Sequence, residues 1–168
     1  LDVARHMFPV EFIKKYIDLL ALHNMNMFHW HLTDDQGWRI EIKRYPRLTE
    51  VGGWRKATLV SHWEKPDHKY DETPYGGYYT QDEIRDIVRY AADRHVEIVP
   101  EIDLPGHMLA ALAAYPELGC TGGPYATGTR WGGYDGGLCS GRGGGSEFLA
   151  GGFSEIVALF PRRNLPIV

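Results

Sequence analysis

The sequence lacks the features that mark several protein classes. None of its apolar runs approaches the roughly 20 residues that a membrane-spanning helix needs. The formal net charge of −4 argues against a nucleic-acid partner, because such proteins usually carry a basic face. No signal-peptide pattern is present, and the chain opens on Leu1 instead of an initiator methionine. We therefore expect a globular protein without membrane or nucleic-acid partners whose start is missing, and we assign it no compartment.

Cysteine is scarce and glycine is abundant. The two cysteines are Cys120 and Cys139, and a disulfide between them or two buried free thiols fit the sequence about equally well. Most of the 20 glycines fall between Gly119 and Gly152, which predicts a glycine-rich loop over about residues 119–146. The length of 168 residues suffices for one sizeable core, so we expect a single domain over 1–168.

Helical and strand patterns alternate along the chain, as in parallel α/β proteins. A helix is predicted after Pro9, and a buried strand over 27–32 follows it and runs into a polar loop. A long irregular stretch covers roughly 44–79. Thr80 and Glu83 then have the capping-box spacing that begins a second helix.

Further patterns complete this alternation. Residues 96–102 are rich in β-branched side chains and form the clearest strand. Residues 1–4 resemble the end of a strand, and 108–114 a short helix. Ser146 is expected to cap a last helix, and 164–168 form one more strand or a frayed tail.

About four strand–helix units result, so the predicted fold class is α/β, a partial (β/α)8 barrel. Four units cannot close a barrel, which needs eight strands and roughly 250 residues. The sheet therefore has two open edges, and these favour pairing with a second copy of the chain or with a complementing half.

Ionisable side chains gather where the predicted strands end. The set is Asp2, Arg5, His29, His31, Asp34, Asp35, Glu101, Asp103 and His107. Active sites of barrels and open α/β folds lie at the carboxyl ends of the strands, so we expect an active site here. The five tryptophans and ten tyrosines weakly favour a carbohydrate ligand.

Two interpretations of the histidines remain open. His29 and His31 face the same side of their strand, where they form a metal pair completed by Asp34 or Asp103, or are satisfied by hydrogen bonds inside the fold. We favour the second.

The remaining charged residues carry similar alternatives. Asp35 caps a turn or belongs to the site, and Glu101 pairs with a neighbouring base or belongs to the site. Arg5 fits a sugar or carboxylate clamp better than a surface charge, because it directly follows a predicted strand.

Four longer strings are more specific. They are residues 1–6, 29–39, 75–80 and 99–107, in an order that resembles the first three strand regions of glycoside hydrolase family 20 β-N-acetylhexosaminidases. This resemblance runs to about Cys139. It implies a barrel enzyme that releases terminal β-linked N-acetylglucosamine or N-acetylgalactosamine without a metal or other cofactor. The nucleophile is then the acetamide oxygen of the substrate itself, and the intermediate is an oxazolinium ion.

The resemblance also implies residue roles. Arg5 would bind ring hydroxyls of the sugar. Asp34 and His107 would form a buried chain that positions an acid Glu and tunes its pKa, with Asp103 in the same polar floor. His31, Asp35 and Glu101 are assigned to the substrate-binding group, with His31 and Asp35 supporting the site more than touching the sugar.

The chain departs from the family after Pro161. The family continues into a strand ending His-x-Gly-Gly-Asp-Glu, whereas residues 162–168 contain neither carboxylate. Three hypotheses follow: a hexosaminidase whose acid comes from another chain or copy, a catalytically incomplete sugar-binding fragment, or a metal-dependent hydrolase that uses His29, His31 and Asp103. A makeshift acid, which could be Asp34, Asp35, Glu101 or Asp103, is the weakest alternative.

Overall fold

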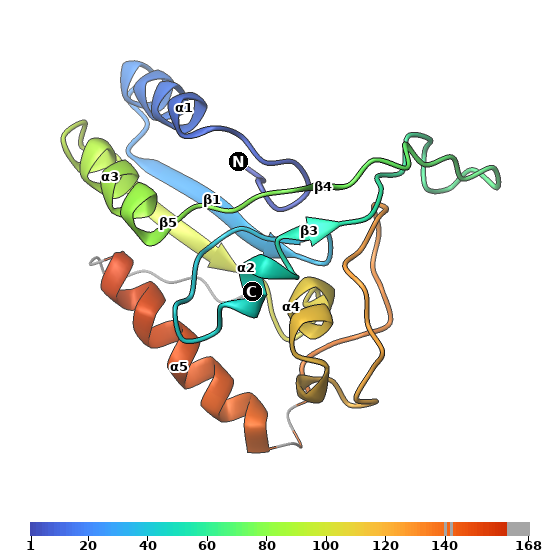
Figure 1. Ribbon diagram of the computed structural model, residues 1–168. Helices are drawn as coiled ribbons and strands as arrows, with labels where there is room; N and C mark the ends of the chain where they lie inside the picture. Colours follow the sequence, from blue (N-terminus) through green and yellow to red (C-terminus); the bar gives the residue numbers. More distant parts are fainter. Residues whose placement is uncertain (140, 142, 161–168) are drawn as a thin grey trace.

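Two parallel strands form the centre of the molecule in a computed structural model that describes residues 1–139, 141 and 143–160. β1 (Met27–Asp34) pairs with β5 (Glu97–Ile102) in a register that places His31 beside Glu101. β2 (Gly37–Trp38) returns antiparallel to β1, which gives the strand order β2-β1-β5. The result is an open, mixed α/β fold over the described residues (Figure 1).

Three long helices flank this sheet. They are α1 (Val10–Leu22), which begins directly after Pro9, α3 (Gln81–Ala92) and α5 (Gly143–Leu159). α3 lies between the other two and contacts both (Figure 1). The predicted capping box at α3 is confirmed, because the Thr80 hydroxyl accepts from the Glu83 N–H and the Glu83 carboxylate accepts from the Thr80 N–H. Among the described helices, none has both the length and the apolarity to cross a membrane.

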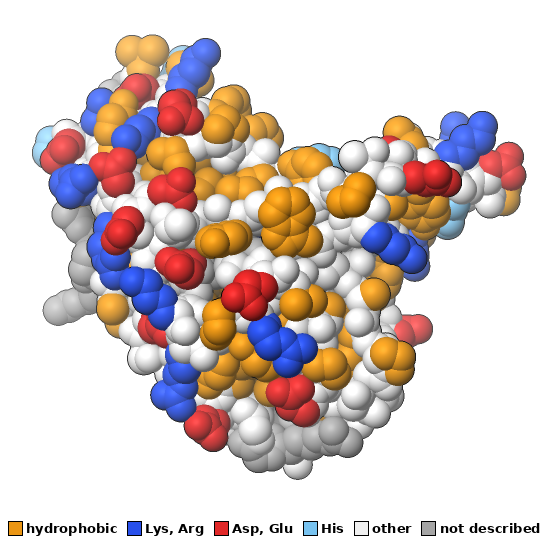
Figure 2. Space-filling view, viewed as in Figure 1, with side chains coloured by type: hydrophobic (Ala, Val, Ile, Leu, Met, Phe, Trp, Pro, Cys, Tyr) orange, Lys and Arg blue, Asp and Glu red, His pale blue; other side chains and the backbone are white. Residues whose placement is uncertain are grey.

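The helix surfaces are laced with ion pairs. Lys14 Nζ lies 2.6 Å from Asp86 Oδ2 and joins α1 to α3, and Arg89 pairs with the same Asp86. Acidic and basic side chains are interspersed on the face seen in Figure 2. Exposed pairs of this kind contribute little to stability, so the fold depends on the core beneath them.

The core lies on one face of β1. Phe28, Trp30 and Leu32 alternate with His29 and His31, and only the first three are fully buried. Strand side chains point alternately to opposite faces, so packing of the aromatic face fixes the histidines on the other. The core continues into Ile13, Ile17, Ile84, Ile87, Ile98 and Tyr79.

Several short elements interrupt the stretch over 44–79 that was expected to be irregular. They are α2 (Arg47–Glu50), β3 (Trp54–Arg55) and β4 (Tyr75–Gly76). β3 and β4 pair antiparallel, and the chain between them projects as an arm (Figure 1). After β5 come α4 (Leu109–Ala114) and a 3-10 helix, η1 (Pro116–Leu118). The short helix expected over 108–114 is thus confirmed.

The strand ends differ from the sequence prediction. β1 continues through Thr33 and Asp34, so the polar loop expected there is a tight turn between β1 and β2. Residues 1–4 contribute one parallel bridge, from Asp2 to His31, and no longer strand. Within the described residues, β1 with α3 and β5 with α4 are strand–helix units, and the Asp2 bridge precedes α1. The segment 164–168 lies outside the described residues.

The last helix begins earlier than predicted. Gly143 is its first residue, so Ser146 lies inside the helix and does not cap it, and the glycine-rich loop ends before residue 143. Packing explains this, because the buried Gly145 lies against Leu138 and tertiary contacts override a weak intrinsic helix preference. Packing also explains the glycine at position 151 within this helix, since a Cβ there would lie 2.8 Å from the Tyr45 hydroxyl.

Cys120 and Cys139 form a disulfide, which settles the alternative of free thiols. Main-chain contacts at the same place join Gly119 to Leu138 and the Cys139 N–H to the Leu118 carbonyl. The ends of the glycine-rich loop are therefore held together by a covalent bond and by hydrogen bonds.

Candidate active site

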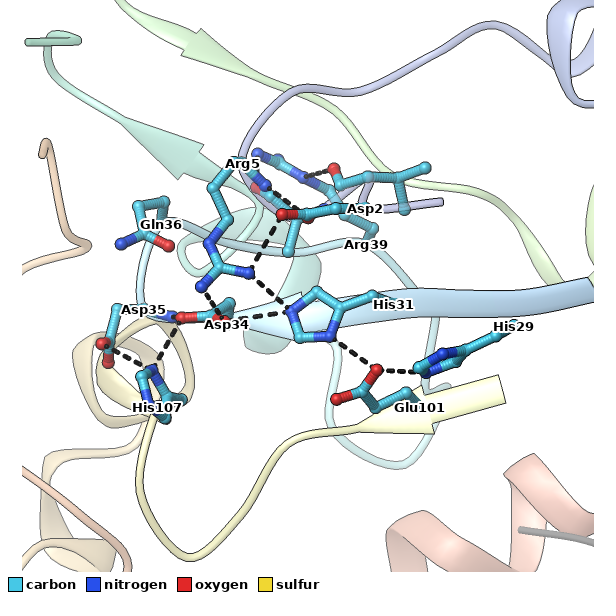
Figure 3. Close-up of polar contacts among 12 residues, drawn as sticks. Asp2, Arg5, His29, His31, Asp34, Asp35, Gln36, Arg39, Glu101 and His107 are labelled. Carbon is cyan, nitrogen blue, oxygen red and sulfur yellow. Dashed lines mark hydrogen bonds and ion pairs between the residues drawn. The ribbon is translucent and has the colours of Figure 1, made fainter. Parts of the chain in front are cut away.

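The ionisable residues predicted from the sequence converge where β1, β5 and the Asp2 bridge end (Figure 3). Asp34 lies at their centre with its side chain only 1% exposed. Its Oδ2 is 2.6 Å from Arg5 Nη2 and 3.0 Å from His31 Nε2. Its Oδ1 accepts from the Asp35 N–H and lies 3.2 Å from His107 Nδ1. Burial raises the pKa of Asp34. The His31 hydrogen bond and the Arg5 charge act in the opposite direction, and the net pKa is below its usual value.

Arg5 is a held side chain and not a surface charge. Its guanidinium contacts Asp2 Oδ2 at 3.0 Å, Asp34 Oδ2 at 2.6 Å and His31 Nε2 at 2.9 Å. The ring of Trp131 covers it, with its centroid 4.8 Å from the Arg5 Cζ. The side chain stays 21% exposed, so it is oriented by its partners and still accessible to a ligand.

His31 connects Arg5 to β5. Its Nδ1 lies 2.9 Å from Glu101 Oε2, the oxygen that His29 Nε2 also contacts. A guanidinium can only donate, so in neutral His31 the Nε2 atom accepts from Arg5 and the Nδ1–H donates to Glu101. Glu101 thus pairs with neighbouring bases, as the simpler interpretation of the sequence expected, and His29 is satisfied by a hydrogen bond.

The protonation of His31 and its contact with Arg5 oppose each other. Burial lowers the pKa of His31, but the hydrogen bonds to Asp34 and Glu101 raise it more, and the net direction is upward. A proton on Nε2 would donate to Asp34 while facing the Arg5 guanidinium. The neutral form therefore holds Arg5 best, and the charged form binds the two carboxylates best.

Asp35 supports the start of α4. The side chain is 1% exposed, and its Oδ1 accepts from the Leu109 N–H at 3.0 Å. Burial is the main cause that raises the pKa of Asp35, and the Asp34 charge adds to it. Among the described residues, the Asp35 carboxylate therefore does not cap the turn that follows it, as one interpretation of the sequence expected. It accepts from an N–H group 74 residues later and lies 3.4 Å from His107 Nδ1.

The expectation of a buried Asp34–His107 chain is wrong in one respect. The contact is present, but the His107 side chain is 44% exposed and only Asp34 is buried. His107 follows the turn after β5 and has a φ of 52°, a conformation uncommon outside glycine. Asp103 belongs to the same floor, where its N–H donates to Thr33 Oγ1 and burial raises its pKa.

Two groups of side chains have the spacing to hold a cation. They are His31, Asp34, Asp103 and Asp34, Asp35, His107. Neither includes His29, so the structure does not assemble the trio proposed for a metal-dependent hydrolase. Asp34 belongs to both groups, and the Arg5 guanidinium already supplies a permanent positive charge 2.6 Å from its Oδ2. This arrangement fits a charge-paired polar floor better than a metal site.

Sequence reasoning missed Arg39, Gln36 and Trp131 as parts of this region. Arg39 is buried and Gln36 nearly so, and Trp131 lies over Arg5 from the glycine-rich loop. Only Trp131 had a signal in the sequence, since a large aromatic side chain within a glycine-rich loop indicates a packing or ligand contact. The contacts of the other two come from segments far apart in the sequence.

Known proteins resemble this chain over nearly its whole length. A β-hexosaminidase of Porphyromonas gingivalis is 47% identical over 161 residues, which cover 96% of this chain and 19% of that protein. One from Vibrio furnissii is 50% identical over 117 residues, or 70% of this chain and 19% of that protein. The chain thus spans about a fifth of the length of these curated relatives.

Solved structures agree with the sequence relatives. A crystal structure of a β-N-acetylhexosaminidase superposes with a TM-score of 0.86 at 36% identity, over 95% of this chain and 32% of that one. Streptomyces plicatus N-acetyl-β-hexosaminidase in complex with Thio-NAglucal gives 0.83 at 43% identity, over 99% and 30%. Residues 1–167 match the model of the glycosyl hydrolase family 20 catalytic domain. The chain therefore belongs to glycosyl hydrolase family 20.

Proposed function

We propose that this chain forms the first part of a (β/α)8 barrel and one wall of the sugar site of a β-N-acetylhexosaminidase. The observation that carries the proposal is the position of Arg5, which Asp2, His31 and Asp34 hold at the carboxyl ends of the strands while part of it stays exposed. The relatives add support, since one Streptomyces plicatus structure is a complex with the product GlcNAc and a Vibrio harveyi enzyme is a complex with N-acetylglucosamine.

The proposed reaction releases terminal β-linked GlcNAc or GalNAc with retention of configuration. The acetamide oxygen of the sugar attacks the anomeric carbon while the glycosidic bond breaks and the leaving oxygen takes a proton. Water then opens the oxazolinium ion. Within this scheme Arg5 donates to ring hydroxyls, and Asp34 with His107 orients the acid that protonates the leaving oxygen.

We assign that acid to a part of the enzyme outside these 168 residues. The string His-x-Gly-Gly-Asp-Glu does not occur in the sequence. Asp34 and Asp35 are buried and engaged, and Glu101 is held by His31 and His29, so each is a poor source of a mobile proton. A complementing half or a second copy could add to the sheet at β5, which among the described strands pairs only with β1.

A hexosaminidase and a catalytically incomplete sugar-binding chain both require the Arg5 site to bind N-acetylhexosamine, and they differ in turnover. Chelator sensitivity would separate them from a metal-dependent hydrolase.

The test combines binding and turnover by the purified chain. Binding of N-acetylglucosamine is followed by NMR, and hydrolysis of 4-nitrophenyl N-acetyl-β-glucosaminide by absorbance. We expect binding that Arg5→Met weakens about 30-fold and that Arg89→Met, a change at an exposed helix residue, leaves intact. Absence of binding by the folded chain contradicts the proposal. Turnover that disappears in Asp34→Ala/His107→Ala would contradict the assignment of the acid to another part of the enzyme.

A further inference from the structure

A cavity adjoins Arg5. It has a volume of about 170 Å³, room for several water molecules at about 30 Å³ each. Its wall includes Arg5, His6, Gln36, Arg55, Arg130 and Trp131. Thr58, Ser61 and Thr129 add hydroxyl groups, and none of the described residues that line it is acidic.

Most of the positive charge in this wall is not neutralised. Arg5 is paired with Asp2 and Asp34, but within the described residues neither Arg55 nor Arg130 has a carboxylate within 4.0 Å. An arginine without a carboxylate partner keeps its charge-assisted hydrogen bonds available to an anionic ligand.

The contacts of the two free arginines leave donors available. Arg55 gives its Nε to Thr58 and its Nη1 to the main-chain carbonyls of Arg5 and Gln36, which fixes the side chain without neutralising it. Its Nη2 has only His6 Nε2, at 3.5 Å. Arg130 donates from Nη1 to the Trp131 carbonyl at 3.3 Å, its one hydrogen bond as a side-chain donor in the described part of the chain.

The His6 ring lies in the wall of the same cavity, beside Arg55. Burial is the first cause that lowers the pKa of His6, and the charges of Arg55 and Arg39 lower it further. Asp2 and Asp71 act in the opposite direction, but they do not reverse the shift. Asp71 is itself occupied by the N–H groups of Thr58 and Thr73.

We propose that this cavity binds a tetrahedral oxyanion carried as a sulfate or phosphate ester on the N-acetylhexosamine ring. The inference rests on the proposed function, because it places the sugar at Arg5. Arg5 and His107 lie on opposite sides of Asp34 (Figure 3), and His107 marks the side of the leaving group in that scheme. A cavity next to Arg5 therefore receives a ring substituent away from the scissile bond. Guanidinium and hydroxyl donors suit the oxygens of such an ester.

His6 provides a direct test with the chain as it is. Its ring-proton NMR signal is titrated with pH in sodium sulfate and in sodium chloride of equal ionic strength. Sulfate in the cavity should raise the pKa of His6 and leave that of His95, at the far end of α3, unchanged. Arg130→Met should abolish the response, and Arg89→Met should retain it. An unchanged His6 pKa, or an equal response in both variants, overturns the proposal.

The second measurement asks whether the anion site acts with the sugar site. Dissociation constants are compared for N-acetylglucosamine, its 3-, 4- and 6-sulfates and the corresponding phosphates. We expect at least one ester to bind about tenfold more tightly than the free sugar, the size of one charge-assisted hydrogen bond. Arg130→Met should remove that preference while the affinity for N-acetylglucosamine stays constant.

The outcomes separate the two proposals. Binding of N-acetylglucosamine with no ester preferred, or with a preference that survives Arg130→Met, overturns the ester site and leaves the proposed function intact. If neither the sugar nor any ester binds at Arg5, the proposed function fails and the ester assignment fails with it. The position of the most tightly bound ester identifies the ring carbon nearest the cavity. Comparing the dissociation constants of the phosphate and the sulfate at that position shows which of the two groups the cavity prefers.

Discussion

Two arginines close to each other in the fold have very different surroundings. Arg39 is fully buried, and all of its hydrogen-bond partners are main-chain carbonyls, at Val3, Ala4, Gly53 and Gly77. No carboxylate within the described residues pairs with it, and burial lowers its pKa to about 10, still well above neutral. Arg39 therefore stays charged near neutral pH, and its role is to join three segments of backbone.

Arg5 has the opposite surroundings. Its partners are Asp2, Asp34 and His31, all of which can change charge, and part of the side chain remains exposed. The comparison teaches that a buried arginine held by carbonyls stabilises the fold, whereas one held by ionisable groups has its position and electrostatic environment set by them. The two can be separated by experiment.

The largest expected effect is on stability. Arg39→Met leaves several buried carbonyls without donors, and we expect the free energy of unfolding to fall by about 4 kcal/mol or more. Urea unfolding measures this, with Arg89→Met as the control that changes it by less than about 0.5 kcal/mol. A loss below about 1 kcal/mol would mean that water replaces the guanidinium, and the contrast between the arginines would fail.

Arg5→Met should have the next largest effect, on binding. We expect affinity for N-acetylglucosamine to fall about 30-fold, or about 2 kcal/mol, because charge-assisted hydrogen bonds to the sugar are lost. Stability should fall by less than in Arg39→Met, since Asp34 keeps the His31, His107 and Asp35 contacts. Equal destabilisation by the two variants, each measured in urea, would show that Arg5 is also mainly structural.

The pH dependence sharpens the comparison further. The raised pKa of His31 stabilises the fold below its unfolded value of about 6.5, and this contribution is lost as pH rises through the higher folded pKa. The lowered pKa values of Asp34 and Glu101 stabilise the fold above pH about 4, and this contribution is lost as pH falls through the folded pKa values. The difference in unfolding free energy between wild type and His31→Gln should therefore shrink between pH 6 and 9. A difference that is flat or grows over this range contradicts the assignment.

Glu101→Gln should have the smallest effect. An amide still offers an acceptor to the His31 Nδ1–H, so we expect sugar affinity to fall only about threefold. Nitrogen-15 NMR of His31 should show the same tautomer and a lower pKa, because the carboxylate charge is gone. A loss as large as that of Arg5→Met would instead favour direct contact between Glu101 and the sugar.

Local patterns in the sequence were sufficient for much of the fold. The capping box at Thr80 and the alternation along β1 depend on residues a few positions apart, and both are observed. The gathering of Arg5, Asp34 and His107 also followed, because the ends of parallel strands share one edge of a sheet.

Features that depend on distant segments could not be predicted in this way. The partners of Arg39 lie 14 to 38 residues away in the chain, and the buried Asp35 caps a helix 74 residues later. The start of α5 at Gly143 depends on packing against the end of the glycine-rich loop, where local preference points the other way.

The Cys120–Cys139 disulfide encloses the segment that carries Arg130 and Trp131. Closing a ring of about 19 residues removes conformational entropy from the unfolded chain, worth about 3 kcal/mol in the chain-entropy description. The same restriction acts in the folded protein, where a flexible glycine-rich loop would otherwise lose its freedom each time a ligand bound. We expect reduction to loosen the segment that holds Trp131 over Arg5. The thiol redox state of the surroundings would then set how well ordered one side of the proposed sugar site is before any sugar arrives.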